Sequence, residues 1–282
     1  MEKAFVCIHG FGDHPDGRGR GFSFALRDNV AQVLEEEPVW EEVLWDDLLE
    51  SPPTDSMVEF VRRVPKIVRK FYRGRHGRPI RERVAEAVRA ASAKAEGAPV
   101  VLVGHSFGGA IAYDVLARGQ APEAKALVML APPMGLFNHP EEFVRSAAGH
   151  GVAGALAALG LDRMAAHIVG FPKVKGGRLP EDISALSIRS GRDWFAISLA
   201  PEFHDVSEIT VKPPRGTRGS ANHRFYWKSP EVAEDVAAEA VSANVAAGAE
   251  CRTQRELALQ NRAVMNSLFT PPRYGDGFVE MS

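Results

Sequence analysis

An uninterrupted apolar run that leads into a glycine-rich turn is the feature that most constrains the fold of this chain. Residues 100–109 read VVLVGHSFGG, and a helical pattern over Phe107–Ala117 follows without a gap. A short apolar run of this kind suits a strand that is buried on both faces, as the strands of parallel sheets are. We therefore expect a parallel strand over Val100–Val103, a tight turn around Ser106 and a helix directly after it.

Similar short runs recur along the chain between longer helical patterns, and this alternation is typical of βαβ units around a parallel sheet. The other expected strands are Ala4–Ile8, Glu42–Trp45, Ala126–Leu130, Leu186–Arg189 and, as a sixth candidate, Glu208–Lys212. The other expected helices are Phe22–Glu36, Pro79–Ala95 and Val232–Ala247. Ser229 is the expected N-cap of the last helix, with Pro230 at its first position. We predict an α/β fold with a mostly parallel central sheet and helices on both faces.

The length of 282 residues suits a single α/β domain with insertions. Residues 133–182 lie between two expected strands and are too long for a simple crossover, and several glycines interrupt any helix there. We interpret this segment as a cap or lid. The last residues, 273–282, have the composition of a poorly ordered tail.

Composition and charge narrow the classes of function. The formal net charge is −2, so electrostatics alone does not attract this chain to nucleic acid. The first residues carry no secretory signal pattern, and no stretch reaches 18 uncharged apolar residues, so we expect a cytoplasmic protein. Cys7 and Cys251 are too isolated to suggest a disulfide framework or a zinc site, and Cys7 is expected to lie in the core.

A basic segment lies between Arg62 and Arg83. It contains ten Lys or Arg residues and one acid, Glu82. Its apolar and basic residues follow a near-helical spacing, so the segment could contact an anionic surface. Pro65 interrupts that spacing, and we favour the alternative that this is a solvated basic face.

The glycine-rich turn has the pattern G-x-S-x-G, formed by Gly104, Ser106 and Gly108. In this pattern a serine occupies a strained turn between strand and helix, and the glycines leave room for neighbouring backbone. The hydroxyl is thereby presented as a nucleophile, beside the free N–H groups at the helix start. The alternative is a strand-to-helix turn without chemistry.

A second motif, His9-Gly10-Phe11-Gly12, follows the first expected strand. A negatively charged intermediate formed at the serine needs two backbone N–H donors, and a neighbouring loop at the same sheet edge supplies one of them. We expect the amides of Phe11 and Phe107 to form this oxyanion hole. Taken alone, HGFG is weak evidence and a tight glycine turn is the alternative; together with the serine turn, the functional interpretation is favoured.

These motifs, HGFG and GHSFGG, and the chain order Ser, Asp, His resemble the α/β-hydrolase superfamily, in particular serine esterase-like and lipase-like members. The resemblance implies that the acid of a catalytic triad follows a late strand and that the histidine follows the last strand. The sequence SGRDW at 190–194 is similar to the turn that carries the acid, which favours Asp193 and leaves Asp182 and Asp205 as rivals.

The resemblance also selects the base of the triad. His223 lies after the last expected strand and before the final helix, whereas His204 precedes that strand. The resemblance further implies that the side chain of His105 points away from the nucleophile and only packs. The triad would then consist of Ser106, His223 and Asp193.

The function hypothesis is hydrolysis of carboxylic esters through an acyl-enzyme, with no metal or organic cofactor. The substrate would be a small-molecule or lipid ester, and the apolar residues of 133–182 suit a cap over an acyl pocket, although ordinary packing explains them equally well. The alternatives are an acyltransferase or thioesterase with the same triad, and a non-catalytic binding protein with a hydrolase fold.

Overall fold

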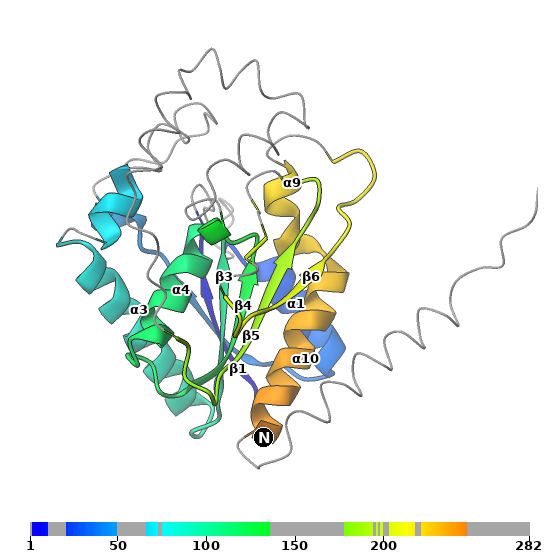
Figure 1. The fold of residues 1–282 in the computed structure, drawn as a ribbon. Helices are drawn as coiled ribbons and strands as arrows, with labels where there is room; N and C mark the ends of the chain where they lie inside the picture. Colours follow the sequence, from blue (N-terminus) through cyan, green and yellow to red (C-terminus); the bar gives the residue numbers. More distant parts are fainter. Residues whose placement is uncertain are drawn as a thin grey trace, which may run out of the picture.

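A parallel sheet forms the centre of the molecule. The computed structural model describes residues 2–10, 21–49, 66–72, 75–135, 178–193, 196, 198–199, 203–217 and 221–246. Within this part of the chain the strands are β1 (Ala4–Ile8), β2 (Val39–Val43), β3 (Val100–His105), β4 (Ala124–Leu130), β5 (Ser184–Arg189) and β6 (Ser207–Thr210). All pair in parallel in the order β2-β1-β3-β4-β5-β6 (Figure 1). The carboxyl ends of the strands therefore share one edge.

Helices cover both faces of this sheet (Figure 1). The α-helices are α1 (Phe24–Leu34), α3 (Gly77–Lys94), α4 (Phe107–Ala117), α9 (Ala221–Arg224) and α10 (Pro230–Ala246), and the short 3-10 helices are η1 (Asp46–Leu49) and η2 (Phe225–Lys228). Helices α1 and α10 pack against one face, whereas α3 and α4 pack against the other. The predicted fold class, a parallel α/β sheet between two helical layers, is confirmed.

The sheet divides the core into two apolar layers. In β1 the side chains of Val6 and Ile8 join the layer with α3 and α4, whereas Phe5 and Cys7 join the layer with α1 and α10. This division follows from the alternation of side chains along a strand. Apolar runs such as VVLV therefore bury every residue, and burial raises the pKa of the Cys7 thiol, as suits the core position predicted for it.

Most predicted elements lie within two residues of those observed, and β2 differs most. The predicted strand was Glu42–Trp45, but the strand ends at Val43. The backbone N–H of Trp45 donates to Nε2 of His9 at 3.0 Å. Trp45 leaves the ladder of strand hydrogen bonds because its amide is used by a side chain instead. The predicted cap of helix α10 is present, since the Val232 amide donates to Oγ of Ser229 at 3.4 Å.

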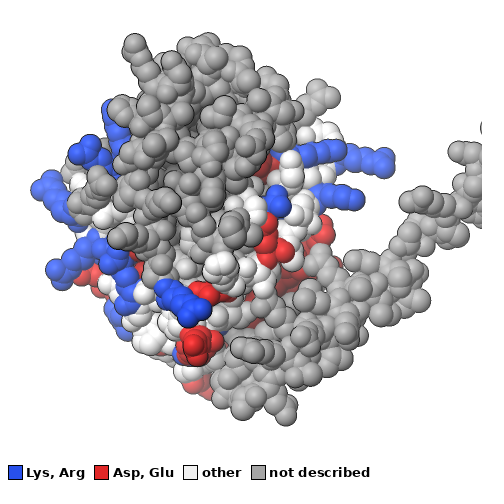
Figure 2. All heavy atoms as spheres, viewed as in Figure 1, with Lys and Arg blue, Asp and Glu red and all other residues white. Residues whose placement is uncertain are grey.

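Part of the basic segment over 62–83 is described. Residues 66–72 are helical, and their apolar residues, Ile67, Val68 and Phe71, are buried in the layer with α3 and α4. Lys66 and Arg69 are exposed. In Figure 2, Lys and Arg side chains are prominent along the side of the molecule where Figure 1 places α3. The apolar side that a membrane-binding helix would insert therefore faces the core, and contact with an anionic surface stays a prediction.

Two other predictions fall largely outside the described residues. Most of the predicted cap, 133–182, and all of the predicted tail, 273–282, are in this category. The division into one domain with a cap therefore stays a prediction. In the part of the chain that the structure describes, no helix combines the length and the apolar character needed to cross a bilayer.

Candidate active site

Ser106 occupies the strained turn that the sequence predicts. It lies between the last residue of β3 and the first residue of α4, with φ 51° and ψ −123°. A positive φ is costly for a residue with a side chain, so the surrounding structure must hold it. The Ser106 amide donates to the carbonyl of Leu130 at 2.8 Å, and the Gly109 amide donates to the Ser106 carbonyl at 3.0 Å. The turn is therefore fixed on both sides.

The glycines around Ser106 are required by close backbone contacts. A Cβ on Gly104 would lie 2.6 Å from backbone atoms of Gly108, and a Cβ on Gly108 would lie 2.3 Å from the carbonyl oxygen of Ile8. These distances are too short for any side chain, which confirms the steric reason given for the two glycines of the pattern. A Cβ on Gly10 would lie 2.8 Å from Cβ of Ser106. The start of the HGFG turn, at Gly10, therefore lies directly against the serine.

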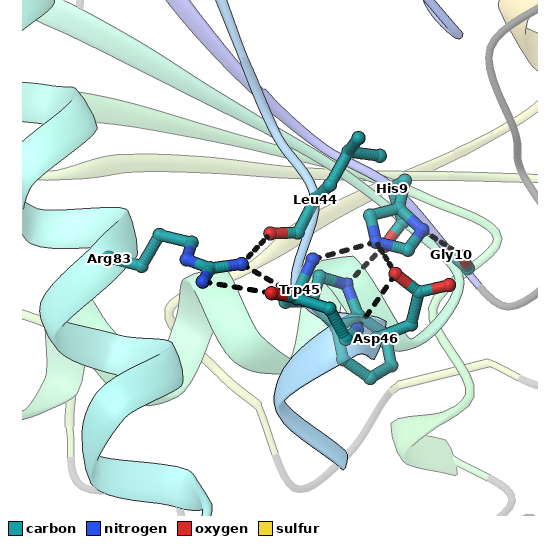
Figure 3. A network of polar contacts seen from close by, with 7 residues as sticks. His9, Gly10, Leu44, Trp45, Asp46 and Arg83 are labelled. Atoms are coloured by element: carbon teal, nitrogen blue, oxygen red, sulfur yellow. Dashed lines mark hydrogen bonds and ion pairs between the residues drawn. The ribbon is translucent and has the colours of Figure 1, made fainter. Parts of the chain in front are cut away.

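His9 holds the start of that turn (Figure 3). Its side chain is completely buried, and its Nε2 accepts the backbone N–H of Trp45 at 3.0 Å. The proton of a neutral ring must then be on Nδ1, which lies 2.6 Å from the carbonyl oxygen of Gly10 and donates to it. The indole Nε1–H of Trp45 in turn donates to the His9 carbonyl at 2.8 Å. The Gly10 carbonyl is thus held by the His9 ring, and that ring and its backbone are held by Trp45.

An ion pair on the outer side secures the turn after β2 (Figure 3). Arg83 of α3 donates to the carbonyl of Leu44 at 2.7 Å and to the carboxylate of Asp47 at 2.6 Å. The guanidinium holds the pKa of Asp47 below its usual range. Asp46 Oδ1 lies 3.7 Å from His9 Nε2. The turn that contacts His9 is therefore anchored to a helix.

The structure brings Asp193 and His223 together. Nδ1 of His223 donates to Oδ2 of Asp193 at 2.9 Å, and both side chains are buried. Asp193 follows β5, and His223 lies on α9 after β6, so both lie on segments that follow strands at the edge where the strands end. The rivals are engaged elsewhere: Asp182 pairs with Lys125 at 2.5 Å, and Asp205 lies 3.8 Å from a guanidinium nitrogen of Arg178.

Tyr226 is a member of this group that the sequence analysis missed. Its hydroxyl donates to Oδ2 of Asp193 at 3.0 Å, the same oxygen that His223 contacts. Desolvation, together with the negative charge of Asp193, raises the pKa of Tyr226 far above its usual range, so this donor keeps its proton. The spacing of three residues between His223 and Tyr226 was the available signal, because residues so spaced share one side of a helical turn.

Four further residues of the sequence analysis have different outcomes. His105 was expected only to pack, but it also contacts the backbone of His223: its Nε2 lies 2.6 Å from the His223 carbonyl oxygen. His204, the rival base, is exposed in the turn before β6. Phe107 is described and packs with its ring against Trp45, at 5.4 Å between ring centroids. Phe11 lies outside the described residues, so its amide stays a prediction.

Comparisons with known proteins give similarity to solved structures alone. No protein-family model and no curated protein matches the chain. A protein of Xanthomonas campestris assigned to the alpha/beta superfamily of hydrolases is 19% identical, with a TM-score of 0.44, over 86% of this chain and 99% of that one. A proline iminopeptidase-related protein of Thermus thermophilus is 16% identical, with a TM-score of 0.43, over 86% and 91%. The RedJ thioesterase of the prodiginine pathway in Streptomyces coelicolor is 16% identical, with a TM-score of 0.37, over 83% and 84%.

Identities and scores of this size assign no activity to the chain, and its own geometry carries the fold assignment. The sheet is parallel throughout its six described strands. A serine with positive φ joins β3 to α4, and an acid and a histidine follow it in chain order at the same sheet edge. A strained serine turn and this chain order are features of one fold. The chain therefore has the α/β-hydrolase fold that its sequence predicts.

Proposed function

We propose that the protein is a serine hydrolase that cleaves carboxylic esters, with Ser106 as nucleophile, His223 as general base and Asp193 as the acid that orients the base. One observation carries the proposal: a serine held at φ 51° stands next in sequence to His105, whose ring contacts the histidine that Asp193 binds at 2.9 Å. Strained backbone at a polar residue is typical of functional sites.

The Asp193 contact determines which nitrogen of His223 acts as base. Because Nδ1 donates to the carboxylate, the neutral ring keeps Nε2 without a proton. Nε2 would take the proton from Ser106 as its oxygen attacks the ester carbonyl. The buried carboxylate of Asp193 would then stabilise the imidazolium. His223 would next give the proton to the departing alcohol, which leaves an acyl group on the serine.

Two backbone amides would stabilise the charge that develops on the ester oxygen. The amide of Phe107 belongs to the first residue of α4, and backbone N–H groups at a helix N-terminus favour negative charge. The amide of Phe11 belongs to the same peptide unit as the Gly10 carbonyl. The hydrogen bond from His9 holds that carbonyl, which is the described part of this peptide unit. Water activated by His223 would then release the acid.

The first experiment measures reactivity of Ser106 itself. Its residue surface is only 4% exposed, so access is the point on which the proposal is most open to refutation. We expect a small serine-directed phosphonate to label the wild type at Ser106, and to leave Ser106→Ala unlabelled. Ser190→Ala, which removes another buried serine, is the matched control and should be labelled like the wild type. Absence of label from the wild type would refute the proposal.

The second experiment identifies the substrate class. A series of p-nitrophenyl esters of increasing acyl length tests activity and chain preference together. The same triad could pass its acyl group to another acceptor or accept thioesters, so product analysis with added alcohols and a parallel series of thioesters separates these alternatives. A non-catalytic binding protein would turn over none of these compounds while still binding an acyl ligand.

A further inference from the structure

We propose that His105 is a positioning residue that holds the turn bearing His223 against the serine. Its Nε2–H donates to the backbone carbonyl of His223, while Asp193 binds the ring of the same residue. The inference rests on the proposed function of Ser106 and His223. His105 would explain how the fold keeps Ser106 and His223, which are distant in sequence, close together.

The pleat of β3 determines where the His105 side chain points. Val103 lies in the core layer with α1 and α10, and side chains two residues apart share a face of the sheet. His105 therefore projects toward the same layer, where it is completely buried. There its ring centroid lies 4.9 Å from that of His223 and 5.4 Å from that of Trp227. The His105 ring therefore packs the end of β3 against α9 and η2.

The short hydrogen bond defines the tautomer of His105. A carbonyl oxygen can only accept, so at 2.6 Å Nε2 must carry the proton. The opposite edge of the ring faces Gly10, because a Cβ built on Gly10 would lie 2.9 Å from Nδ1 of His105. The ring of His105 therefore lies between Gly10 and the turn that carries His223.

The two contacts to His223 restrain different parts of it. Asp193 limits rotation of the imidazole, whereas His105 limits displacement of the backbone from which the imidazole projects. Because His105 and Ser106 are adjacent in the chain, this restraint links the position of the base to the position of the nucleophile. A displacement of about 1 Å in such a group lowers turnover on the order of 100-fold.

A matched pair of variants separates the hydrogen bond from simple packing. His105→Gln can place an amide N–H near the position of Nε2, whereas His105→Met fills a similar volume without a donor. With an ester that the wild type cleaves, we expect kcat to fall roughly 10- to 100-fold in His105→Met while KM changes less than about 2-fold. In His105→Gln, kcat should recover to within about 5-fold of the wild type. Equal kcat in both variants, at similar thermal midpoints, would overturn the proposal.

A second readout does not require turnover. The Nδ1 proton of His223 is held by Asp193, so we expect a resolved low-field proton resonance in the wild type that is absent from Asp193→Ala. The resonance should persist in His105→Gln and broaden or vanish in His105→Met, because a loosened turn exposes this proton to exchange. A resonance unchanged in His105→Met contradicts the positioning role. If the wild type cleaves no ester but the resonance follows this pattern, the ester proposal fails and the positioning role stands.

Discussion

Tyr226 donates a hydrogen bond to Asp193 at 3.0 Å, on the same carboxylate oxygen that accepts the Nδ1 proton of His223 at 2.9 Å. Two donors therefore converge on one oxygen of a buried acid. A buried carboxylate is costly unless it is hydrogen-bonded, so both donors stabilise the carboxylate of Asp193. Tyr226 therefore helps to hold the acid that orients His223, although its hydroxyl is not proposed to touch substrate.

The first prediction concerns this hydroxyl. Tyr226→Phe keeps the ring but leaves Asp193 with one donor fewer, so we expect kcat/KM for an ester substrate to fall about 5- to 30-fold. Steady-state kinetics checks this. Tyr113→Phe is the control, because Tyr113 lies on α4 and packs at right angles on Phe203. Unchanged kinetics in both variants would contradict the assignment.

The second prediction tests the acid. Asp193→Asn retains the shape of the side chain but removes its charge and can favour the wrong tautomer of His223, so kcat should fall about 10³- to 10⁴-fold. The same substitution at Asp182, whose partner is Lys125 on the surface, should leave kcat within about 2-fold of the wild type. Kinetics with one ester on both variants decides between them. A large loss in Asp182→Asn alone would transfer the role to that residue.

The third prediction concerns the close contact between β1 and α4. Gly108→Ala would place a Cβ 2.3 Å from the Ile8 carbonyl oxygen, so backbone must shift, and we expect the free energy of unfolding to fall about 1–3 kcal/mol. Gly191→Ala is the matched control, because nothing lies within 4 Å of its Cβ position. That variant should stay within about 0.5 kcal/mol of the wild type in denaturant titrations. Equal losses would contradict the steric explanation.

The fourth prediction concerns the ion pair that anchors the turn after β2. The folded pKa of Asp47 is depressed by Arg83, so the stability from this pair is present above the unfolded pKa and is lost as pH falls through the folded pKa. Arg83→Gln should lower the free energy of unfolding by roughly 0.5–1 kcal/mol at pH 7, since both side chains are partly exposed.

Titration with acid checks the sign of this effect. The difference between Arg83→Gln and the wild type should shrink as pH falls below the usual carboxyl pKa, about 3.9. Arg78→Gln, whose partner Glu82 lies one turn away on an exposed face, is the comparison and should leave the free energy of unfolding almost unchanged. A difference that grows in acid would refute the role given to Asp47.

Much of the architecture was predictable from local pattern. The strand at Ala4–Ile8 and the helix at Phe107–Ala117 were placed to the residue, because an apolar run and a helical period are properties of a few neighbouring residues. The end of β2 was not predictable in this way. Trp45 continues the apolar pattern, but its amide bonds to His9, which is distant in sequence.

The amino-acid sequence by itself determined that Ser106 stands between a strand and a helix, with a glycine two residues before it and two residues after it. Only glycine tolerates the backbone contacts at positions 104 and 108. Only the tertiary structure decided which acid meets His223 and that Tyr226 and His105 join them. Hydrogen bonds between loops depend on strand order and on the register of the sheet, and those follow from the packing of the whole chain rather than from neighbouring residues.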